Sequence, residues 1–477
     1  MAIGVVEKQE HLNLAFNHFN YFHIPSAFGV NFDLTGNLPK VNWSSSSSLK
    51  MLNLVSSSFS GELPDSIGYL KPLNSLNLTS CQILQLTLLD LSENNLDGKI
   101  PNFSGLHNLQ TLHLHNNSLN GTLPSCDVVE LRTFTNLKNL DYLDLSYNSL
   151  SVSTINNINN TLPKLRSFYM TFCKIKEFPD FFKALENVEQ LDVSNNEIHE
   201  KIPKWNLEIL DLRSNLIQGQ LPVPPLSGNI PMMFGMGNQL EILNLNGNQF
   251  EGPVTRSLTN CRQLQVLDLG NNKINDTFPY WLRSLPELRV LVLRSNKFHG
   301  PIDNSKPNLS FPKFRIVDLS HNKFTGHLSG RYFKHFKAMR NKTMPNEKYL
   351  SFGSYYQASI AVTMKGSYIS LTGIFTLFIT IDLSSNKFNG DIPNVIRRLN
   401  SLIVLNLSHN SLTGFIPFSL GDLTEFESLD LSSNQLIGKI PNQLKSLTFL
   451  EVFNLSCNHL DGPIPQGEQF DTFVNDS

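Results

Sequence analysis

Residues 405–417 read LNLSHNSLTGFIP, residues 429–441 read LDLSSNQLIGKIP, and residues 453–465 read FNLSCNHLDGPIP. The three segments share one pattern, in which an apolar residue and a leucine flank one variable residue, an asparagine follows, and G-x-I-P closes the copy. Each copy begins 24 residues after the previous one. A pattern that returns at a fixed period of this length is typical of a solenoid, in which every copy forms one coil of the chain.

Each position of the pattern has a physical role in such a coil. The alternating leucines predict a short strand whose leucines point inward, while the intervening residues point out onto a concave face. The asparagine is expected to turn inward and to satisfy backbone groups of the turn, so that stacked copies form a ladder of hydrogen bonds. The glycine permits a tight bend, and the proline fixes the backbone on the far side.

The fuller pattern L-x-x-L-x-L-x-x-N is the signature of leucine-rich repeats. We therefore predict a leucine-rich-repeat solenoid, shaped as an α/β horseshoe or superhelix, with a parallel concave sheet and an irregular or 3-10 convex side. The expected regions are a non-repeat start at 1–10, repeats at 11–328, an island insertion at 329–378, C-terminal repeats at 379–465 and a truncated end at 466–477. The period is irregular near residues 17–57, 81–94 and 196–248.

The island interrupts the ladder, because Asn322 and the next inward asparagine, Asn386, are 64 residues apart. A long insertion in a compact array is usually functional or disordered. This one is rich in aromatic and basic residues. Its segment 331–340 is expected to form a short amphipathic helix, with Phe333, Phe336 and Met339 packed down and the basic side chains outward.

Composition and motifs argue against several classes of function. The 38 Lys and Arg nearly balance the 40 Asp and Glu, which gives no support for a nucleic-acid partner. No phosphate-binding loop, nucleophile elbow, kinase signature or H-E-x-x-H motif occurs, so we expect no enzyme. The histidines have no ligand spacing, and we expect neither a cofactor nor a metal site.

The five cysteines are widely spaced and predict no disulfide framework. Cys81 and Cys173 occupy the inward asparagine position, where the repeat accepts cysteine, and we expect them to be buried thiols. Cys457 precedes the inward Asn458 and is expected to be exposed.

Charged residues at outward positions of neighbouring coils form a candidate ligand-binding patch. Arginines on adjacent coils are well suited to hold a ligand carboxylate. The alternative is a set of surface charges that pair with one another and bind nothing. The patch consists of Asp268, Arg289, Arg294, Arg315, Asp318 and His321.

Ten of the chain's N-x-[S/T] sequons are candidate glycosylation sites, although such triplets also arise by chance in a chain rich in Asn and Ser. Three of them, Asn77, Asn406 and Asn454, fall at outward strand positions. The others are Asn42, Asn102, Asn116, Asn159, Asn275, Asn308 and Asn341.

Two longer segments resemble a known family. LDLGNNKINDTFPYWLRSLPELRVLVLRSNKFHG at 267–300 and SLDLSSNQLIGKIP at 428–441 are similar to plant receptor-like proteins, which are kinase-less leucine-rich-repeat receptors of the fungal-resistance type. Thr363–Gly366 resembles a motif of that family's island. The resemblance implies repeats of the plant extracellular type, placed on the outer side of the plasma membrane.

The resemblance also implies a function in plant defence or development. A protein or peptide ligand is expected on the concave face and the island, and a partner receptor kinase on the C-terminal repeats. The island candidates for ligand contact are Tyr349, Tyr355, Tyr356 and Lys365. From the sequence we expect no signal-peptide core and no membrane-spanning run in this chain.

Two other hypotheses remain open. One is a secreted leucine-rich-repeat inhibitor of cell-wall-degrading enzymes, which the 64-residue step disfavours because such inhibitors lack an island. The other is a truncated product without a function of its own, which the irregular steps and the absence of recognisable caps favour.

Overall fold

The computed structural model describes 21 internal stretches and five short N-terminal strands. The stretches are 87–93, 97–98, 100, 103, 106–119, 122–123, 134, 137–152, 164–178, 187–203, 207–221, 234–235, 237–302, 311–328, 330–334, 336–340, 351–352, 356–357, 359–364, 367–375 and 377–472. The N-terminal strands are 11–13, 23–24, 32–33, 51–53 and 75–77. The chain divides into two compact units, Met1–Ile217 and Gln218–Ser477, here called unit 1 and unit 2.

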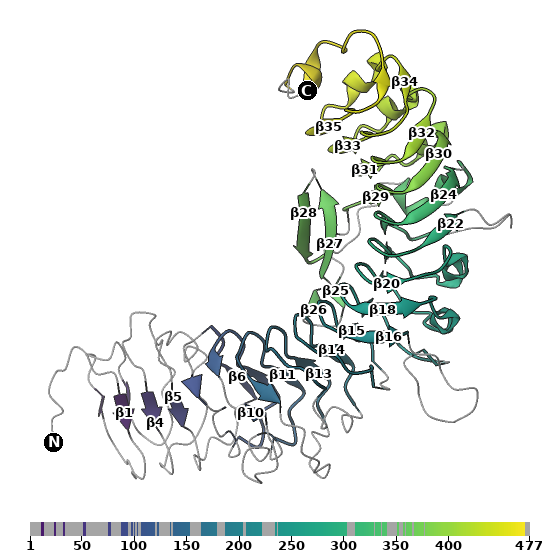
Figure 1. The fold of residues 1–477 in the computed structure, drawn as a ribbon. Coiled ribbons are helices and arrows are strands. Elements are labelled where there is room, and N and C mark those ends of the chain that lie inside the picture. Colours follow the sequence, from purple (N-terminus) through teal and green to yellow (C-terminus); the bar gives the residue numbers. More distant parts are fainter. Residues whose placement is uncertain are drawn as a thin grey trace. The chain divides into compact units, whose positions relative to one another are not determined.

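The concave sheet of unit 2 is parallel and follows the repeat register. Its strands pair in chain order, apart from the pieces of the insertion (Figure 1). They are β17 (Ile242–Asn244), β19 (Val266–Asp268), β21 (Val290–Val292), β23 (Ile316–Asp318), β29 (Thr380–Asp382), β31 (Val404–Asn406), β33 (Ser428–Asp430) and β35 (Val452–Asn454). From β17 to β33 the inward apolar residues, such as Leu267 in β19 and Leu269 just after it, are buried, as the alternation predicts. In the last strand, β35, the inward Phe453 is only half-buried.

Short strands also follow the inward asparagines, on one flank of unit 2. They are β16 (Gln218–Gln220), β18 (Gln249–Gly252), β20 (Lys273–Ile274), β22 (His299–Pro301), β24 (Lys323–His327), β30 (Lys387–Asp391), β32 (Ser411–Thr413), β34 (Ile437–Gly438) and β36 (His459–Leu460). The repeat glycine belongs to this flank. Gly390 has a φ of 75°, in the left-handed region that favours glycine, and an added Cβ would also meet the ring of His327.

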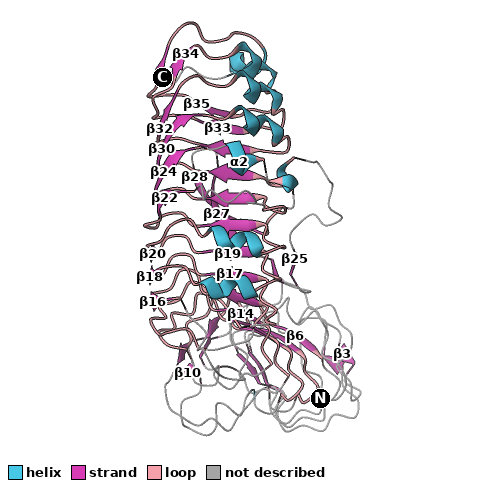
Figure 2. Ribbon diagram, turned by 90° about the vertical axis from the view of Figure 1, so that its right-hand side faces the viewer, coloured by secondary structure: helices cyan, strands magenta, loops and turns pink. Residues whose placement is uncertain are grey.

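The convex side of unit 2 carries short helices, stacked one above the other in Figure 2. They are η4 (Arg256–Asn260), η5 (Tyr280–Ser284), η7 (Asn394–Arg398), η8 (Phe418–Asp422), η9 (Asn442–Ser446) and η10 (Glu468–Thr472). The repeat proline stands directly before η7, η8 and η9, so its fixed φ prepares the entry to each helix. The predicted 3-10 convex side is confirmed.

Unit 1 repeats the same plan. Its concave strands pair in parallel and in chain order, and are β6 (Leu88–Asp90), β8 (Thr111–His113), β11 (Tyr142–Asp144), β13 (Ser167–Tyr169), β14 (Gln190–Asp192) and β15 (Ile209–Asp211). Further short pairs are β7 (Asp97–Gly98) with β9 (Ser118–Leu119) and β10 (Thr122–Leu123) with β12 (Ser151–Val152). β14 and β15 pair in full register although the step near 196–215 is short.

The irregular N-terminal steps coincide with changes in pairing. β1 (His11–Asn13), β4 (Met51–Asn53) and β5 (Ser75–Asn77) form a separate parallel sheet, which ends where the 13-residue step at 81–94 begins. β1 pairs directly with β4, so the 40-residue step at 17–57 lies within one coil. That coil contains an antiparallel pair, β2 (His23–Ile24) with β3 (Phe32–Asp33).

The inward asparagines form the expected ladder. Asn296 Nδ2 donates to the carbonyl oxygens of Leu269, Leu293 and Arg294, at 2.9–3.1 Å. Its Oδ1 accepts from Ile274 N at 2.9 Å, so one side chain ties two coils together. Cys173 takes the donor role in its own coil, because its Sγ contacts Leu145 O at 3.2 Å.

Phenylalanines add a second ladder two residues after the asparagines. The rings of Phe298 and Phe324 stack at 5.8 Å, and those of Phe324 and Phe388 at 6.2 Å. All three side chains are fully buried, which places the aromatic part of the core beneath the flank strands.

The insertion leaves the solenoid between two adjacent strands, since β23 pairs directly with β29. Its first part forms two short helices, α2 (Gly330–Phe333) and η6 (Lys337–Met339), instead of the single helix expected. The prediction that Phe333, Phe336 and Met339 pack down is confirmed, because all three are buried.

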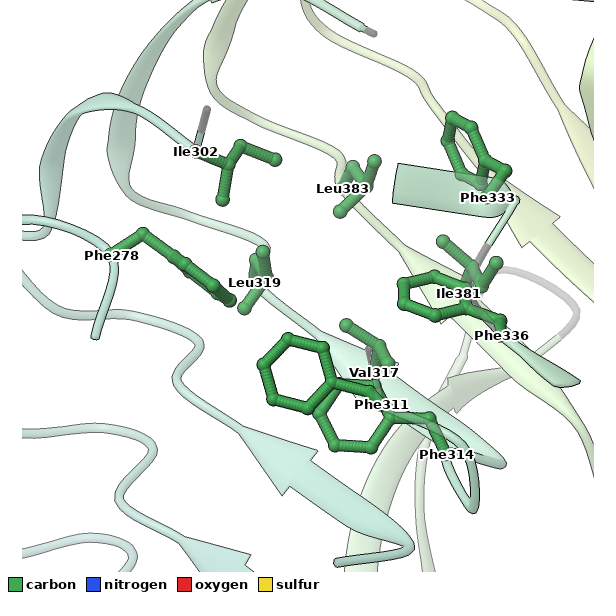
Figure 3. A pocket seen from close by; sticks show the side chains of 10 residues that line it. All are labelled: Phe278, Ile302, Phe311, Phe314, Val317, Leu319, Phe333, Phe336, Ile381 and Leu383. Carbon is green, nitrogen blue, oxygen red and sulfur yellow. The ribbon is translucent and has the colours of Figure 1, made fainter. Parts of the chain in front are cut away.

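These helices close an apolar pocket on unit 2. Figure 3 shows aromatic and aliphatic side chains from α2, from β29 and from the preceding coils converging on it. The lining residues are Phe278, Ile302, Phe311, Phe314, Val317, Leu319, Phe333, Phe336, Ile381 and Leu383. Ser401 N donates to Met339 O at 3.1 Å and joins η6 to the coil of η7, so 330–340 acts as the convex part of its coil.

The second part of the insertion turns to the other side of the sheet. It contains the antiparallel pairs β25 (Ser351–Phe352) with β26 (Tyr356–Gln357) and β27 (Ser359–Met364) with β28 (Ser367–Thr372). We call the latter pair the island hairpin. It lies in front of the concave sheet of unit 2 (Figure 1), and Ser359 O accepts a hydrogen bond from Asn244 Nδ2 at 3.2 Å.

Residues 468–472, in the segment where no cap was expected, form η10. Phe470 is buried and its ring lies 5.3 Å from that of Phe453 in the last concave strand. Gln469 Nε2 donates to Leu450 O at 3.0 Å. Across the described stretches, no helix combines the length and the apolar character that a bilayer crossing requires.

The three cysteines within the described residues divide by burial, which predicts a labelling pattern; Cys81 and Cys126 lie outside those residues. Cys173 and Cys261 are buried, and burial raises the pKa of each thiol to about 12, while Cys457 is exposed. Because the thiolate is the reactive form, we expect maleimide at pH 7.5 to modify Cys457 at least tenfold faster than Cys173 or Cys261. Peptide mapping by mass spectrometry measures the three rates. Equal labelling of Cys173 and Cys457 in native protein would contradict the ladder role of Cys173.

Candidate ligand-binding face

In-register pairing arranges the outward residues of unit 2 in columns across the strands. The first column contains Ile242, Val266, Val290 and Ile316, which stand opposite one another in turn. All four are buried, and so are Ile360 and Val362 of the island hairpin. Because an isolated two-stranded hairpin is marginally stable, it needs an apolar surface such as this column. The hydrogen bond from Asn244 to Ser359 places the hairpin on the concave side of unit 2, beside this column.

The acidic members of the predicted patch serve the fold. Asp268 and Asp318 are 1% and 2% exposed, so the expectation that they face a ligand is wrong. Asp318 Oδ1 accepts from Ser320 N at 2.9 Å and from Ser320 Oγ at 2.6 Å. Asp268 Oδ1 accepts from Gly270 N at 2.9 Å. The carboxylate closes the turn that ends the strand, and the recurring L-D-L-[S/G] string is the sequence signal for this role.

Arg294 is also removed from the patch. Its side chain is buried and its Nη1 lies 3.6 Å from Asp318 Oδ2. Burial raises the pKa of Asp318, and the neighbouring Arg294 opposes that rise. A buried guanidinium held by a buried carboxylate contributes to the interior and is not offered to a ligand. The structure therefore does not place Arg294 with the accessible members of the predicted patch.

Asp382 stands beside Asp318 on the next strand. Its Oδ1 accepts from Ser384 N at 2.9 Å, and the side chain is 3% exposed. Burial, together with the negative charge of Asp318, raises the pKa of Asp382 to about 7. The coil interface thus contains an acid that is protonated over much of the acidic pH range.

Arg289 and Arg315 remain as an accessible basic pair. They precede the paired residues Val290 and Ile316, so they occupy adjacent coils, and both are half-buried. Burial lowers the pKa of the Arg315 guanidinium, and the charge of Arg289 lowers it further. Two partly desolvated guanidinium groups side by side favour an anion between them. His321 of the predicted patch is exposed three residues after β23, on the same coil as Arg315.

The island candidates are only partly placed. Tyr349, Tyr355 and Lys365 lie outside the described residues, and Tyr356 is described only through the backbone of β26. What the structure adds is the island hairpin, whose position in front of the concave sheet the repeat period does not encode.

The sequons fall into three groups. Asn116 and Asn275 are exposed. Asn406 and Asn454 are half-buried, and each Oδ1 accepts from the backbone of the serine two residues on, as the aspartates do. Asn77 ends β5, and the remaining predicted sites, Asn42, Asn102, Asn159, Asn308 and Asn341, lie outside the described residues.

Unit 1 brings together a group that sequence spacing missed. His113, His115 and Asp144 have side-chain ligand atoms within 4.8 Å of one another on the concave side. His113 ends β8 opposite Asp144 of β11, and His115 follows two residues later. From sequence spacing we expect the histidines to be scattered. The structure instead places His113 and His115, at the end of one strand, beside Asp144 of the next coil.

Comparison with known proteins agrees with this architecture. Leucine-rich-repeat family models match residues 238–298 and 380–436, and shorter segments at 85–106 and 108–126. Receptor-like protein 18 of Arabidopsis thaliana is 37% identical over 421 residues, covering 75% of this chain and 48% of that protein. The chain is a homologue of plant leucine-rich-repeat receptor-like proteins. This receptor-like homologue spans about half the length of that relative.

Solved structures show the same fold. The ectodomain of the Arabidopsis thaliana receptor kinase GASSHO1/SCHENGEN3, solved with CASPARIAN STRIP INTEGRITY FACTOR 2, matches with a TM-score of 0.53 at 24% identity, over 96% of this chain and 56% of that one. The ectodomain of the Arabidopsis receptor kinase HAESA, solved with an extended IDA peptide hormone, matches with a TM-score of 0.50 at 25% identity, over 93% and 73%. The receptor-like homologue therefore has the architecture of plant receptor ectodomains.

Proposed function

We propose that this chain is the ligand-recognising part of a receptor-like protein in plant defence or developmental signalling. It binds a protein or peptide ligand on the concave side of unit 2, beside the island hairpin, on the outer side of the plasma membrane. The observation that carries the proposal is the half-buried pair Arg289 and Arg315 on adjacent coils. The pair suits an anionic group such as a terminal carboxylate, and HAESA, a structural relative, was solved with a peptide hormone.

The C-terminal repeats at 379–465 are proposed to meet a partner receptor kinase. Large apolar side chains are strongly exposed there, which is common at surfaces that bind another protein. Phe415 is 67% exposed and Phe418 61% exposed, and Phe415 lies next to Ile437 of the following coil. A receptor without a kinase domain needs a partner that has one in order to signal.

A peptide-library selection tests the role of the arginine pair. Immobilised chain is offered two pools of random synthetic peptides, one with free C-terminal carboxylates and one amidated. We expect enrichment from the free-carboxylate pool only. The double variant Arg289→Gln/Arg315→Gln should bind the enriched peptides at least tenfold more weakly, a loss of about 1.4 kcal/mol or more.

The matched control is Arg256→Gln/Arg262→Gln, which removes the same charge from exposed positions in and after η4. It should bind like the wild type, and thermal melts should show that both double variants are folded. Equal enrichment from the two pools, or full affinity in the Arg289/Arg315 variant, would contradict the proposed anion site.

A further inference from the structure

The histidine cluster of unit 1 has the geometry of a metal site. His115 Nδ1 lies 3.2 Å from Asp144 Oδ2. Two ligands bound to one zinc ion at about 2.0–2.1 Å with a tetrahedral angle are themselves about 3.3 Å apart. The third ligand atom, from His113, lies within 4.8 Å of both. Because two ligand atoms on one zinc ion lie about 3.3 Å apart, the His113 ring must turn toward the other two ligands when the ion binds.

Neighbouring groups hold these side chains in place. Asp144 Oδ1 accepts from Ser146 N at 2.9 Å, which leaves Oδ2 directed to the histidines. The His113 ring packs on Tyr142 at 4.8 Å between centroids. Supporting contacts of this kind fix the orientation of ligands in metal sites.

The cluster is also accessible to solvent, and nearby carboxylates make the local electrostatic potential negative. The side chains of His115 and Asp144 are 32% and 15% exposed, so an ion from solvent can reach them. Asp90 stands opposite His113 on the other neighbouring strand and adds a second carboxylate to the local field. A set of two imidazoles and one carboxylate suits zinc and similar divalent transition ions better than Mg²⁺ or Ca²⁺.

We propose that His113, His115 and Asp144 bind a divalent transition-metal ion of the zinc class on the concave face of unit 1. Three protein ligands leave at least one coordination position open toward solvent. That position takes water in the free protein and is available to a donor group of a bound molecule. The site is independent of the arginine pair proposed for unit 2.

The test uses the full chain, freed of metal with a chelator and dialysed. Zinc chloride is titrated by calorimetry, with magnesium chloride as the comparison ion, and cobalt chloride is added in a second experiment to follow its visible absorption. We expect saturable zinc binding at one site, no magnesium binding, and a cobalt spectrum of low-coordinate N/O type. His113→Ala, His115→Ala and Asp144→Asn should each weaken zinc binding at least tenfold.

His409→Ala is the matched control, because His409 is exposed at the end of a concave strand in unit 2. It should leave the zinc isotherm unchanged. Asp144→Asn keeps an oxygen for Ser146 N, so it separates loss of a metal ligand from loss of the turn. The proposal is overturned if zinc produces no saturable heat. It is equally overturned if folded His115→Ala binds zinc like the wild type, which would leave only an ion pair between His115 and Asp144.

Discussion

Replacing Asn434 with alanine is expected to lower the free energy of unfolding by about 3 kcal/mol or more. Asn434 is buried, and its Nδ2 donates to the carbonyl oxygens of Leu407, Leu431 and Ser432 at 3.0–3.1 Å. Its Oδ1 accepts from Leu412 N at 3.0 Å. Alanine removes all four hydrogen bonds, each worth about 0.5–1.5 kcal/mol, and Leu412 N loses its side-chain acceptor. The three carbonyl oxygens keep other donors, namely Asn410 Nδ2, Asn458 Nδ2 and His409 N.

Urea denaturation followed by circular dichroism measures the loss. Asn434→Asp is nearly isosteric but cannot donate and places a carboxylate among three carbonyl oxygens, so it should be at least as destabilising. Gln435→Ala, at the exposed neighbouring position, is the control and should change stability by less than about 0.5 kcal/mol. A loss below 1 kcal/mol in Asn434→Ala would show that the ladder is not what joins the coils.

Stability is expected to fall as the pH rises from about 4 to about 7. Burial beside Asp318 raises the pKa of Asp382 from 3.8 to about 7, and burial beside Asp211 raises that of Asp192 to about 7 as well. The folded state then holds protons that the unfolded state has released. The stabilisation from each acid is complete below the unfolded pKa and is lost as the pH passes through the folded pKa.

Asp382→Asn should flatten this dependence and stabilise the protein at pH 8, by on the order of 2 kcal/mol. The substitution is one that the array already uses, because Asn406 at the equivalent position accepts the same hydrogen bond, from Ser408 N. Urea melts at pH 4, 6 and 8 compare the variant with the wild type. Asp430→Asn, at the equivalent position two coils on and half-buried, is the control. A variant that is less stable than the wild type at pH 8 would contradict the assignment.

The repeat period predicts the contacts within each coil and between adjacent coils. The inward leucines, the Asn ladder, the glycine bend and the convex 3-10 turns are all read from one copy and repeated. Cys173 illustrates how far this reaches, because its position in the pattern alone predicts both its burial and its place in the ladder. These features depend on contacts within one coil or between adjacent coils.

The period does not predict what covers the concave face. Alternation places Asp318 and Arg294 outward, but both are buried and form an ion pair between adjacent coils. The hydrogen bond from Asn244 to Ser359 joins residues 115 positions apart, across the insertion. The repeat period also does not predict the histidine cluster of unit 1. His115 and Asp144 belong to adjacent coils of unequal length and come together only when those coils stack.

Hydrogen exchange of the full chain, with and without a peptide enriched from the free-carboxylate pool, is the most direct test of recognition on the concave side of unit 2. We predict slower exchange in 289–294, in 315–321 and in the island hairpin at 359–372, with no change in the convex helices η7 to η9. Protection confined to those convex helices, or protection in unit 1 alone, would contradict the proposed binding face.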